Sequence, residues 1–378
     1  MIDKVSPSFW EKQTFYRAQQ VIIVGSGIVG LTAAYFLKQK DKSLRITIIE
    51  RGSIPTGAST RNAGFACFGS ISELLSDQSQ QSIDQVESLI RMRESGLRLL
   101  RHIVPDEEME YHHSGGFEYF PQHQEELYKS CESQIDHFNS VVKEATGLAN
   151  TFAKVPASRF GFLSHLPLIY NQHEGQLHPA KMIIYLKNHL TSQGVSFLNG
   201  ARVKDIIESG NEVKVQCHDN LELVSEQLIL ATNAFSSKII DVKDVKAVRN
   251  QVFLTNEING LQAIGCFHCE EGYVYFRNVG KRILIGGARQ HFDTEETENF
   301  GQTQEVKDYL LNFIKTEIGL PNELRFEHEW SGILAVGESK KPIIQRISPR
   351  QTIGVRMGGM GIAIGSKVGK KLADLTFS

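Results

Sequence analysis

The sequence contains few cysteines and no excess of charge of either sign. Its 378 residues include 41 lysines and arginines against 43 aspartates and glutamates, which gives a formal net charge of −2. This balance provides no basic surface for nucleic acid and no polybasic tail for a membrane surface, so neither is expected as a partner. The five cysteines are scattered along the chain: Cys67, Cys131, Cys217, Cys266 and Cys269. Their odd number fits a reducing compartment better than a disulfide framework, and we expect a cytoplasmic location.

Only one stretch lacks charge for long enough to cross a membrane. No side chain between Gln19 and Leu37 is charged, which is about the length that a membrane-spanning helix requires. The stretch divides into two parts, however, because VIIV is β-branched and typical of a strand, whereas the pattern from Ile28 is helical. A strand and a helix joined by glycines predict a βαβ unit, so no integral membrane segment is expected.

Three glycines at this junction predict a nucleotide site. Gly25, Gly27 and Gly30 have the spacing G-x-G-x-x-G. The first permits a tight turn, the second lets a pyrophosphate approach the backbone, and the third lets the helix pack close to the strand. The next predicted strand, LRITIIE, ends at Glu50, whose carboxylate suits the two hydroxyls of an adenosine ribose and would repel a 2′-phosphate. The pattern therefore predicts FAD or NAD and not NADP; the alternative is an ordinary tight turn followed by a surface glutamate.

The central and C-terminal segments favour FAD over NAD. After GQLHPAK the pattern predicts an amphipathic helix and strands at Val195–Leu198 and near Val203. EVKVQCHD and LELVSE have the pattern of a β-meander, and LILATNAF that of a further, buried strand. A meander inserted as a crossover in a doubly wound sheet is typical of FAD domains. GVRMGGMGIAIGSKVGKKLADL predicts a strand, a glycine turn and a helix beginning near Gly361, whose positive end would stabilise a reduced flavin.

The order of these motifs resembles that of the FAD-dependent D-amino-acid oxidase superfamily. The matching segments are VIIVGSGIVGLTAAYFL, IIERGSIPTGASTRNAGF, GQLHPAKMIIYLKNHLTSQGVSF, LILATNAFS, GYVYFRNVGKRILIGGAR, EWSGILAVGESKKPIIQR and IGVRMGGMGIAIGSKVGKKLADL. They run from Val21 to the C-terminal region in the family's order. GASTRNAGF and LHP are most similar to the γ-glutamylputrescine oxidoreductase branch, and glycine oxidase-like proteins are also similar.

The resemblance implies an α/β fold with two discontinuous domains. Residues 1–109, 172–235 and 330–378 would form a Rossmann-like FAD-binding domain, with a parallel sheet and the β-meander crossover. Residues 110–171 and 236–329 would form an α+β substrate cap with an antiparallel sheet, in which GYVYFRN and KRILIGGAR are paired strands. The polar stretch Asp77–Arg101 has a helical period, and we expect a solvated helix there rather than a binding site.

The motifs and the resemblance together assign a set of FAD-binding residues. They are Gly25, Ser26, Gly27, Ile28, Val29, Gly30, Glu50, Arg51, Ala58, Ser59, Arg61, Asn62, Ala63, Gly64, Val203, Ala231, Thr232, Asn233, Gly332, Arg356, Gly358, Gly359, Met360, Gly361 and Ile362. Sarcosine-oxidase-like members of the family attach FAD through a cysteine just beyond the tryptophan–glycine stretch. Residues 330–342 contain no cysteine, so we expect FAD to be bound non-covalently.

The expected chemistry is oxidation of the carbon–nitrogen bond of a small amine or amino acid, such as a D-amino acid, an N-substituted glycine or a polyamine derivative. A hydride would pass to flavin N5, and water would hydrolyse the resulting imine. Family members take their substrate contacts from the cap strands, so the candidate residues are Tyr273, Tyr275, Arg277 and Arg289. Arg289 is the preferred anchor for a substrate carboxylate, and a surface arginine paired with a nearby acid is the alternative.

Some departures from the family leave alternatives open. The stretch Ile333–Ala335 lacks the arginine that often binds the substrate carboxylate, and the oxygen-activating lysine of the sarcosine oxidase branch would fall near Leu284. The electron acceptor is therefore oxygen or another molecule, and the oligomeric state stays open. An NAD-dependent dehydrogenase and a non-catalytic FAD-binding protein are the rival classes. No metal is expected, because CFHC (266–269) resembles half a zinc site but no second ligand pair follows it.

Overall fold

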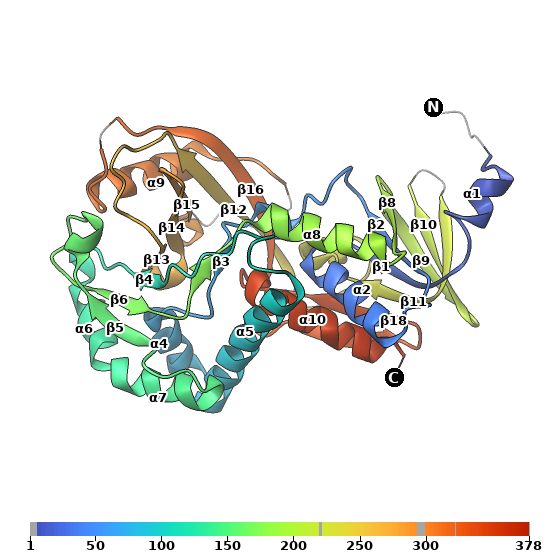
Figure 1. Ribbon diagram of the computed structural model, residues 1–378, viewed down its shortest axis with the longest axis horizontal. Helices are drawn as coiled ribbons and strands as arrows, with labels where there is room; N and C mark the ends of the chain where they lie inside the picture. Colours follow the sequence, from blue (N-terminus) through green and yellow to red (C-terminus); the bar gives the residue numbers. More distant parts are fainter. Residues whose placement is uncertain (1–5, 219–220, 293–298, 322, 378) are drawn as a thin grey trace.

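Two eight-stranded sheets, each covered by helices, form the two ends of the molecule (Figure 1). The structure is a computed structural model and describes residues 6–218, 221–292, 299–321 and 323–377. Three separate segments of the chain contribute strands to the first sheet, on the right of Figure 1, and two segments contribute to the second. The predicted α/β fold, with a nucleotide-binding sheet and a cap, is confirmed.

The first sheet has the strand order β17-β18-β11-β1-β2-β8. These strands are β1 (Gln19–Val24), β2 (Ile46–Glu50), β8 (Ser196–Asn199), β11 (Glu222–Leu230), β17 (Ile343–Ser348) and β18 (Gln351–Val355). All of these neighbours are parallel except β17 and β18. In β1, Val21 and Ile23 pack against the helices, whereas Ile22 packs on the opposite face. Burial on both faces explains why VIIV is uniformly apolar.

The meander consists of β9 (Val203–Ser209) and β10 (Glu212–Cys217), which lead into β11. The sequence predicts separate strands for LELVSE and LILATNAF, but the structure joins them in the single strand β11. The first half of β11 pairs with β10, and its second half lies between β1 and β18. No glycine or proline interrupts Glu222–Leu230, so nothing in the sequence ends the strand between its two halves.

Helix α10 is packed closely between two other helices. The helices that pack on the Val21 and Ile23 face of the sheet, or on one another there, are α2 (Ile28–Lys40), α5 (Ile83–Ile103), α8 (Pro179–Ser192) and α10 (Gly361–Thr376); α4 (Ile71–Gln80) lies toward the cap (Figure 1). A Cβ on Gly365 of α10 would lie 2.6 Å from Ile28 Cγ2 of α2, and one on Gly96 of α5 would overlap the carbonyl oxygen of Ala363. A Cβ on Gly369 would lie 2.7 Å from the backbone nitrogen of Ala33. Glycine at these positions therefore sets the spacing of three helices.

The expectation of a solvated helix over Asp77–Arg101 is wrong. Helix α5, which covers most of this stretch, buries Val86, Ile90 and Leu97, and its Arg93 is only 2% exposed. The apolar residues recur every three or four positions and form a stripe that faces the core. The many charged residues between them concealed this stripe in the sequence.

The second sheet forms the centre of the cap and has the strand order β16-β12-β15-β14-β13-β4-β6-β5. The strands are β4 (Gly116–Glu118), β5 (Phe152–Val155), β6 (Leu168–Asn171), β12 (Lys246–Thr255), β13 (Cys266–Cys269), β14 (Val274–Val279), β15 (Arg282–Gly287) and β16 (Phe326–Val336). Helices α6 (Glu125–Ser133), α7 (Ile135–Thr146) and α9 (Gln304–Thr316) accompany it. β14 and β15 form the antiparallel pair that the sequence predicts. The exact domain boundaries stay a prediction, and β16 runs across the boundary predicted at residue 330.

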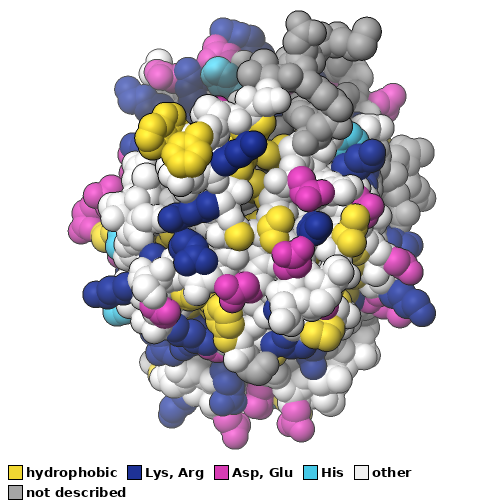
Figure 2. Space-filling view, turned by 90° about the vertical axis from the view of Figure 1, so that its right-hand side faces the viewer, with side chains coloured by type: hydrophobic (Ala, Val, Ile, Leu, Met, Phe, Trp, Pro, Cys, Tyr) yellow, Lys and Arg dark blue, Asp and Glu magenta, His cyan; other side chains and the backbone are white. Residues whose placement is uncertain are grey.

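The surface combines charges of both signs. On the face shown in Figure 2, basic and acidic side chains are interspersed, with small groups of hydrophobic side chains between them. The short helix α1 (Phe9–Gln13) lies at the edge of the molecule, where Phe9 and Trp10 are exposed. Among the described residues, no helix combines the length and apolar character that a membrane span requires. All five cysteines are buried, and none of them is part of a disulfide.

Candidate functional site

The turn between β1 and α2 adopts the conformation that the glycine spacing predicts. Gly25 has a φ of 105°, and a Cβ there would lie 2.7 Å from the carbonyl oxygen of Ala231. A Cβ on Gly30 would overlap the carbonyl oxygen of Gly25, so only glycine lets α2 start this close to β1. Gly27 is the N-cap of α2 and has no side chain to cap it. Instead, Ser59 Oγ accepts a hydrogen bond of 3.0 Å from the backbone N–H of Ile28.

Glu50 is held at the end of β2 by three hydrogen bonds. Its Oε2 accepts from the backbone N–H of Ser26 at 3.2 Å and from Ser26 Oγ at 2.7 Å, and its Oε1 accepts from the N–H of Gly52 at 3.1 Å. The residue is 8% exposed, and that exposure faces a cavity. The carboxylate is therefore pre-oriented, and it retains acceptor capacity for ligand hydroxyls.

The cavity beside Glu50 has a volume of about 410 Å³. The predicted FAD-binding residues that line it are Gly25, Gly27, Ile28, Val29, Glu50, Arg51, Ala58, Ser59, Asn62, Val203, Ala231, Thr232, Asn233, Gly359, Gly361 and Ile362. The N-termini of α2 and α10 both open onto it, and both favour negative charge. Thr232 Oγ1 is buried here without a hydrogen-bond partner within the described chain. We call this space the nucleotide cavity.

A second cavity of about 300 Å³ continues from the first and shares Ala58, Asn62, Leu334, Gly359 and Ile362 with it. The other predicted residues on its wall are Arg61, Ala63, Gly64, Gly332, Gly358, Met360, Tyr273, Tyr275 and Arg289. Residues of the cap strands and of the loops beside the nucleotide cavity therefore surround one space, which we call the substrate cavity. Its continuity with the nucleotide cavity fits a ligand with a nucleotide half and a flavin half. Of the predicted residues, Gly27 to Val29 would hold the pyrophosphate of FAD, Glu50 the ribose and Gly359 to Ile362 the flavin.

Arg289 enters the substrate cavity from a turn at the end of β15. Gly287 and Ala288 have φ values of 104° and 65°, and this turn places Arg289 at the start of a short 3-10 helix, Arg289–His291. Its guanidinium carbon lies 5.2 Å from the centre of the Tyr273 ring. Within the described residues, Arg289 forms no ion pair with a carboxylate.

Tyr275 contributes a hydroxyl group to the same wall. Asn250 Nδ2 donates to Tyr275 Oη at 2.9 Å, and Asn250 Oδ1 is buried without a partner in the described structure. Burial raises the pKa of Tyr275, more than the nearby Arg289 lowers it, so the hydroxyl stays protonated and can donate a hydrogen bond.

Four predicted residues lie outside the walls of both cavities. Ser26 binds Glu50, and Gly30 packs beneath the turn. The buried guanidinium of Arg277 donates to backbone carbonyls of Ala63 at 2.5 Å and of Leu177 at 3.3 Å, so it braces the loop that leaves α3 (Ala58–Arg61). Arg356 pairs with Asp244 and donates to the carbonyl of Lys341 at 2.7 Å. The side chains of Arg277 and Arg356 are thus committed to the protein itself.

A charged network that no sequence motif indicates lies on the wall of the substrate cavity. Lys340 Nζ lies 2.6 Å from Asp77 Oδ1 and 3.2 Å from Glu73 Oε1, and Arg93 lies 3.0 Å from Glu73. Burial alone would raise the pKa of Glu73, but Arg93 and Lys340 lower it to about 2. Burial raises the pKa of Asp77, and its Oδ2 has no partner within the described chain. The pairing of α4 with the loop before β17 is a tertiary contact that no local pattern encodes.

The whole chain is similar to known flavoproteins. The family model for FAD dependent oxidoreductases (DAO) matches residues 20–375, whereas no curated protein sequence matches the chain. Similar solved structures include glycine oxidase from Geobacillus kaustophilus, with a TM-score of 0.76, 16% identity and 95% of both chains covered. L-proline dehydrogenase from P. horikoshii has a TM-score of 0.75 and 17% identity, covering 95% of this chain and 93% of that one. Iminodiacetate oxidase from Chelativorans sp. BNC1 has a TM-score of 0.74 and 17% identity, with 95% of both chains covered.

At identities of 16–17%, the solved structures show a shared fold and no more. The family match covers residues 20–375, and this range includes the glycine turn, Glu50 and the C-terminal helix. The chain therefore belongs to the FAD dependent oxidoreductase (DAO) family, and its cofactor is FAD.

Proposed function

We propose that this FAD-dependent oxidoreductase oxidises the carbon–nitrogen bond of a small amine or amino acid: a D-amino acid, an N-substituted glycine or a polyamine derivative. The observation that carries the proposal is the substrate cavity, which continues from the nucleotide cavity and bears Arg289 and Tyr275. Bound FAD supplies a two-electron acceptor for a hydride from the carbon next to nitrogen, and water hydrolyses the imine that results. The similar structures named for glycine, proline and iminodiacetate support this substrate class.

Arg289 would bind the substrate carboxylate. Its guanidinium is half-buried on the cavity wall, stacks near Tyr273 and has no carboxylate partner among the described residues. A guanidinium in this setting can form two parallel hydrogen bonds to a carboxylate, which orients the substrate as well as binding it. The protonated hydroxyl of Tyr275 would add a third donor, and the unpartnered Oδ2 of Asp77 would accept from the amino group.

The outer end of the substrate cavity would admit the substrate. Glu271 and Tyr273 line both this cavity and an outer one of about 510 Å³. Glu270 and Glu271 have φ values of 52° and 56°, followed by Gly272 at 82°, so the segment between the two cavities is held in an uncommon backbone conformation. Tyr273 is 40% exposed. Its ring would cover the anchored substrate and limit water around it.

A dehydrogenase that passes electrons to an acceptor other than oxygen is the second candidate. It is favoured by Leu284, which is 4% exposed and packs with Ala63 and Val252 where the resemblance would place an oxygen-activating lysine. Reoxidation of the reduced protein by air and by an artificial electron acceptor would separate an oxidase from a dehydrogenase.

The proposal is tested by anaerobic reduction of the purified flavoprotein. A panel of D-amino acids, N-methyl amino acids and polyamine derivatives is added, and loss of the flavin absorbance is followed. We expect at least one of these classes to bleach the flavin. Failure of the whole panel, with dithionite still reducing the flavin, would refute the proposed substrate class.

Arg289→Ala then tests the anchor. With a carboxylate substrate, the variant is expected to raise KM by the equivalent of about 2–5 kcal/mol while flavin content is retained. Arg289→Lys should recover part of this loss, because an ammonium cannot form the paired hydrogen bonds. Arg282→Ala is the matched control, since Arg282 begins the strand that leads to Arg289 and pairs with Glu327 outside the cavity. An unchanged KM in Arg289→Ala would remove Arg289 as the anchor.

A further inference from the structure

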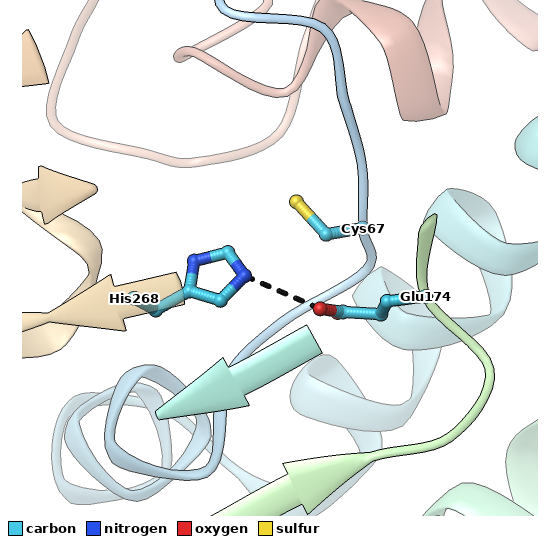
Figure 3. Close-up of side chains that lie close together, drawn as sticks. All are labelled: Cys67, Glu174 and His268. Carbon is cyan, nitrogen blue, oxygen red and sulfur yellow. Dashed lines mark hydrogen bonds and ion pairs between the residues drawn. The ribbon is translucent and has the colours of Figure 1, made fainter. Parts of the chain in front are cut away.

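Cys67, Glu174 and His268 come together from three distant parts of the chain (Figure 3). Strands β3 (Phe65–Ala66) and β7 (Gly175–Gln176) pair with Ala66 opposite Gly175, so Cys67 and Glu174 lie at the same end of this pair. His268 belongs to β13. Cys266, on the same strand, donates a hydrogen bond of 3.1 Å from its Sγ to the carbonyl oxygen of Gly175 on β7. Cys67 and His268 both line the substrate cavity, and Glu174 lies behind them, fully buried.

The three side chains present ligand atoms toward a common point. One ligand atom from each lies within 4.8 Å of the other two, and His268 Nε2 is 3.2 Å from Glu174 Oε2. A tetrahedral zinc ion with bonds of about 2.0–2.3 Å separates its ligands by roughly 3.3–3.8 Å. The histidine and carboxylate atoms, at 3.2 Å, would need to separate by only a few tenths of an ångström, and a rotation of the Cys67 side chain would bring in the third ligand.

Glu174 is oriented for this arrangement by the backbone. Its Oε1 accepts from the N–H groups of Phe68 at 3.0 Å and Gly69 at 3.2 Å, so its other oxygen faces His268. Hydrogen bonds of this kind hold a metal-binding carboxylate in position. The cavity side stays open, which leaves room for a fourth ligand such as water.

The charges around the cluster favour a cation. Glu174 and Glu118 are both buried, and neither forms an ion pair with a lysine or arginine in the part of the chain that the structure describes. Burial would lower the pKa of His268, but the hydrogen bond and charge of Glu174 raise it. Burial and the charge of Glu174 raise the pKa of Cys67. Zn²⁺ would displace the protons of Cys67 and His268, and it would neutralise the two negative charges of the thiolate and the carboxylate that then ligate it.

We propose that Cys67, Glu174 and His268 form a binding site for Zn²⁺ on the wall of the substrate cavity, with the fourth coordination position facing the cavity. A sulfur, nitrogen and oxygen ligand set selects a borderline metal such as zinc over magnesium or calcium. The sequence predicts no metal because the motif CFHC places His268 only beside Cys266 and Cys269, with no second ligand pair. The site instead takes one ligand from that motif and two from elsewhere in the chain.

The test is equilibrium dialysis of the flavin-loaded protein against Zn²⁺ at increasing concentration, followed by metal analysis. We expect one Zn²⁺ per chain and no Mg²⁺ under the same conditions. Cys67→Ser and His268→Gln should each weaken Zn²⁺ binding by more than about 100-fold, beyond the loss typical of outer-sphere partners. Cys266→Ser is the matched control: it removes a buried thiol nearby, a serine can keep the bond to Gly175, and Zn²⁺ binding should persist.

Two results would overturn the proposal: no saturable Zn²⁺ binding by the unmodified protein, or binding that survives both Cys67→Ser and His268→Gln. Cadmium NMR of the unmodified protein gives a check that needs no variant, because a thiolate ligand shifts the cadmium resonance strongly. A resonance without sulfur ligation would equally reject the site. The outcome is independent of the amine-oxidation proposal, since no substrate is used in any of these measurements.

Discussion

Replacing Glu50 by alanine is expected to weaken FAD binding by about 2–3 kcal/mol, because a pair of charge-assisted hydrogen bonds to the ribose is lost. This corresponds to a rise in Kd of roughly 30–160-fold. The structure adds a second contribution. The same carboxylate holds Ser26 and Gly52 by three hydrogen bonds of 2.7–3.2 Å, so its removal also releases the glycine turn.

The two contributions can be separated. Ser26→Ala removes the 2.7 Å hydroxyl bond to Glu50 but keeps the carboxylate that faces the cavity, so it should raise Kd less than Glu50→Ala does. The measurement is a titration of the apoprotein with FAD, followed by quenching of flavin fluorescence. Glu222→Ala is the control, because Glu222 is exposed on β11 away from the cavity. A folded Glu50→Ala protein with a Kd within about threefold of the original would refute the assignment, and equal losses in both variants would assign the effect to the turn alone.

Three further predictions concern the cofactor and the charged network. Gly27→Val should leave a folded chain without flavin, because a Cβ there lies 2.9 Å from Ser59 Oγ and would displace the group that caps α2. Acid or heat denaturation should release all the flavin into the supernatant, and flavin that stays with the precipitated chain would disprove non-covalent binding. Glu73→Gln should lower the free energy of unfolding by about 3 kcal/mol above pH 4.5, since its cationic partners overcome burial and hold the pKa of Glu73 at about 2. Because the folded pKa is lowered, this stabilisation is lost as the pH falls from 4.5 toward 2, and a difference between wild type and variant that does not shrink in denaturant unfolding near pH 3 would contradict it.

The parts of the fold that rest on local backbone requirements could be predicted. The positive φ of Gly25 and the close approach at Gly30 leave no other residue possible, so the β1–α2 turn is visible in the sequence. The hairpin of β14 and β15 is also local, since a short turn that contains Gly280 joins its two apolar strands. Helix α5 is less visible in the sequence, because charged residues alternate along it with the apolar residues of its inner face.

Among the predicted site residues, those that belong to a short local pattern could likewise be assigned from the sequence, and those whose contacts are distant could not. Glu50 and the glycines occupy fixed positions in a short pattern, whereas the partners of an arginine depend on segments far away in the chain. Arg289 and Arg277 look equivalent in the sequence, but Arg289 faces the substrate cavity, whereas Arg277 is buried against the backbone carbonyls of Ala63 and Leu177. Lys340 meets Asp77 across more than two hundred residues of chain. The relative position of the two sheets determines which residues form such pairs. Local periodicity in the sequence does not indicate this position.

The position of α10 has a consequence for the order in which the protein is made. The glycine turn at residues 25–30 is synthesised more than 300 residues before the other side of the nucleotide cavity, which contains Gly359, Gly361 and Ile362. Strand β18 and helix α10 complete the central layer, and the contacts of Gly365 and Gly369 with α2 form only once α10 has been synthesised. A nascent chain that ends before β18 therefore has the phosphate-binding turn without the wall that encloses the flavin. FAD loading is thus coupled to the synthesis of α10, and the cofactor joins a chain whose cap has already been translated.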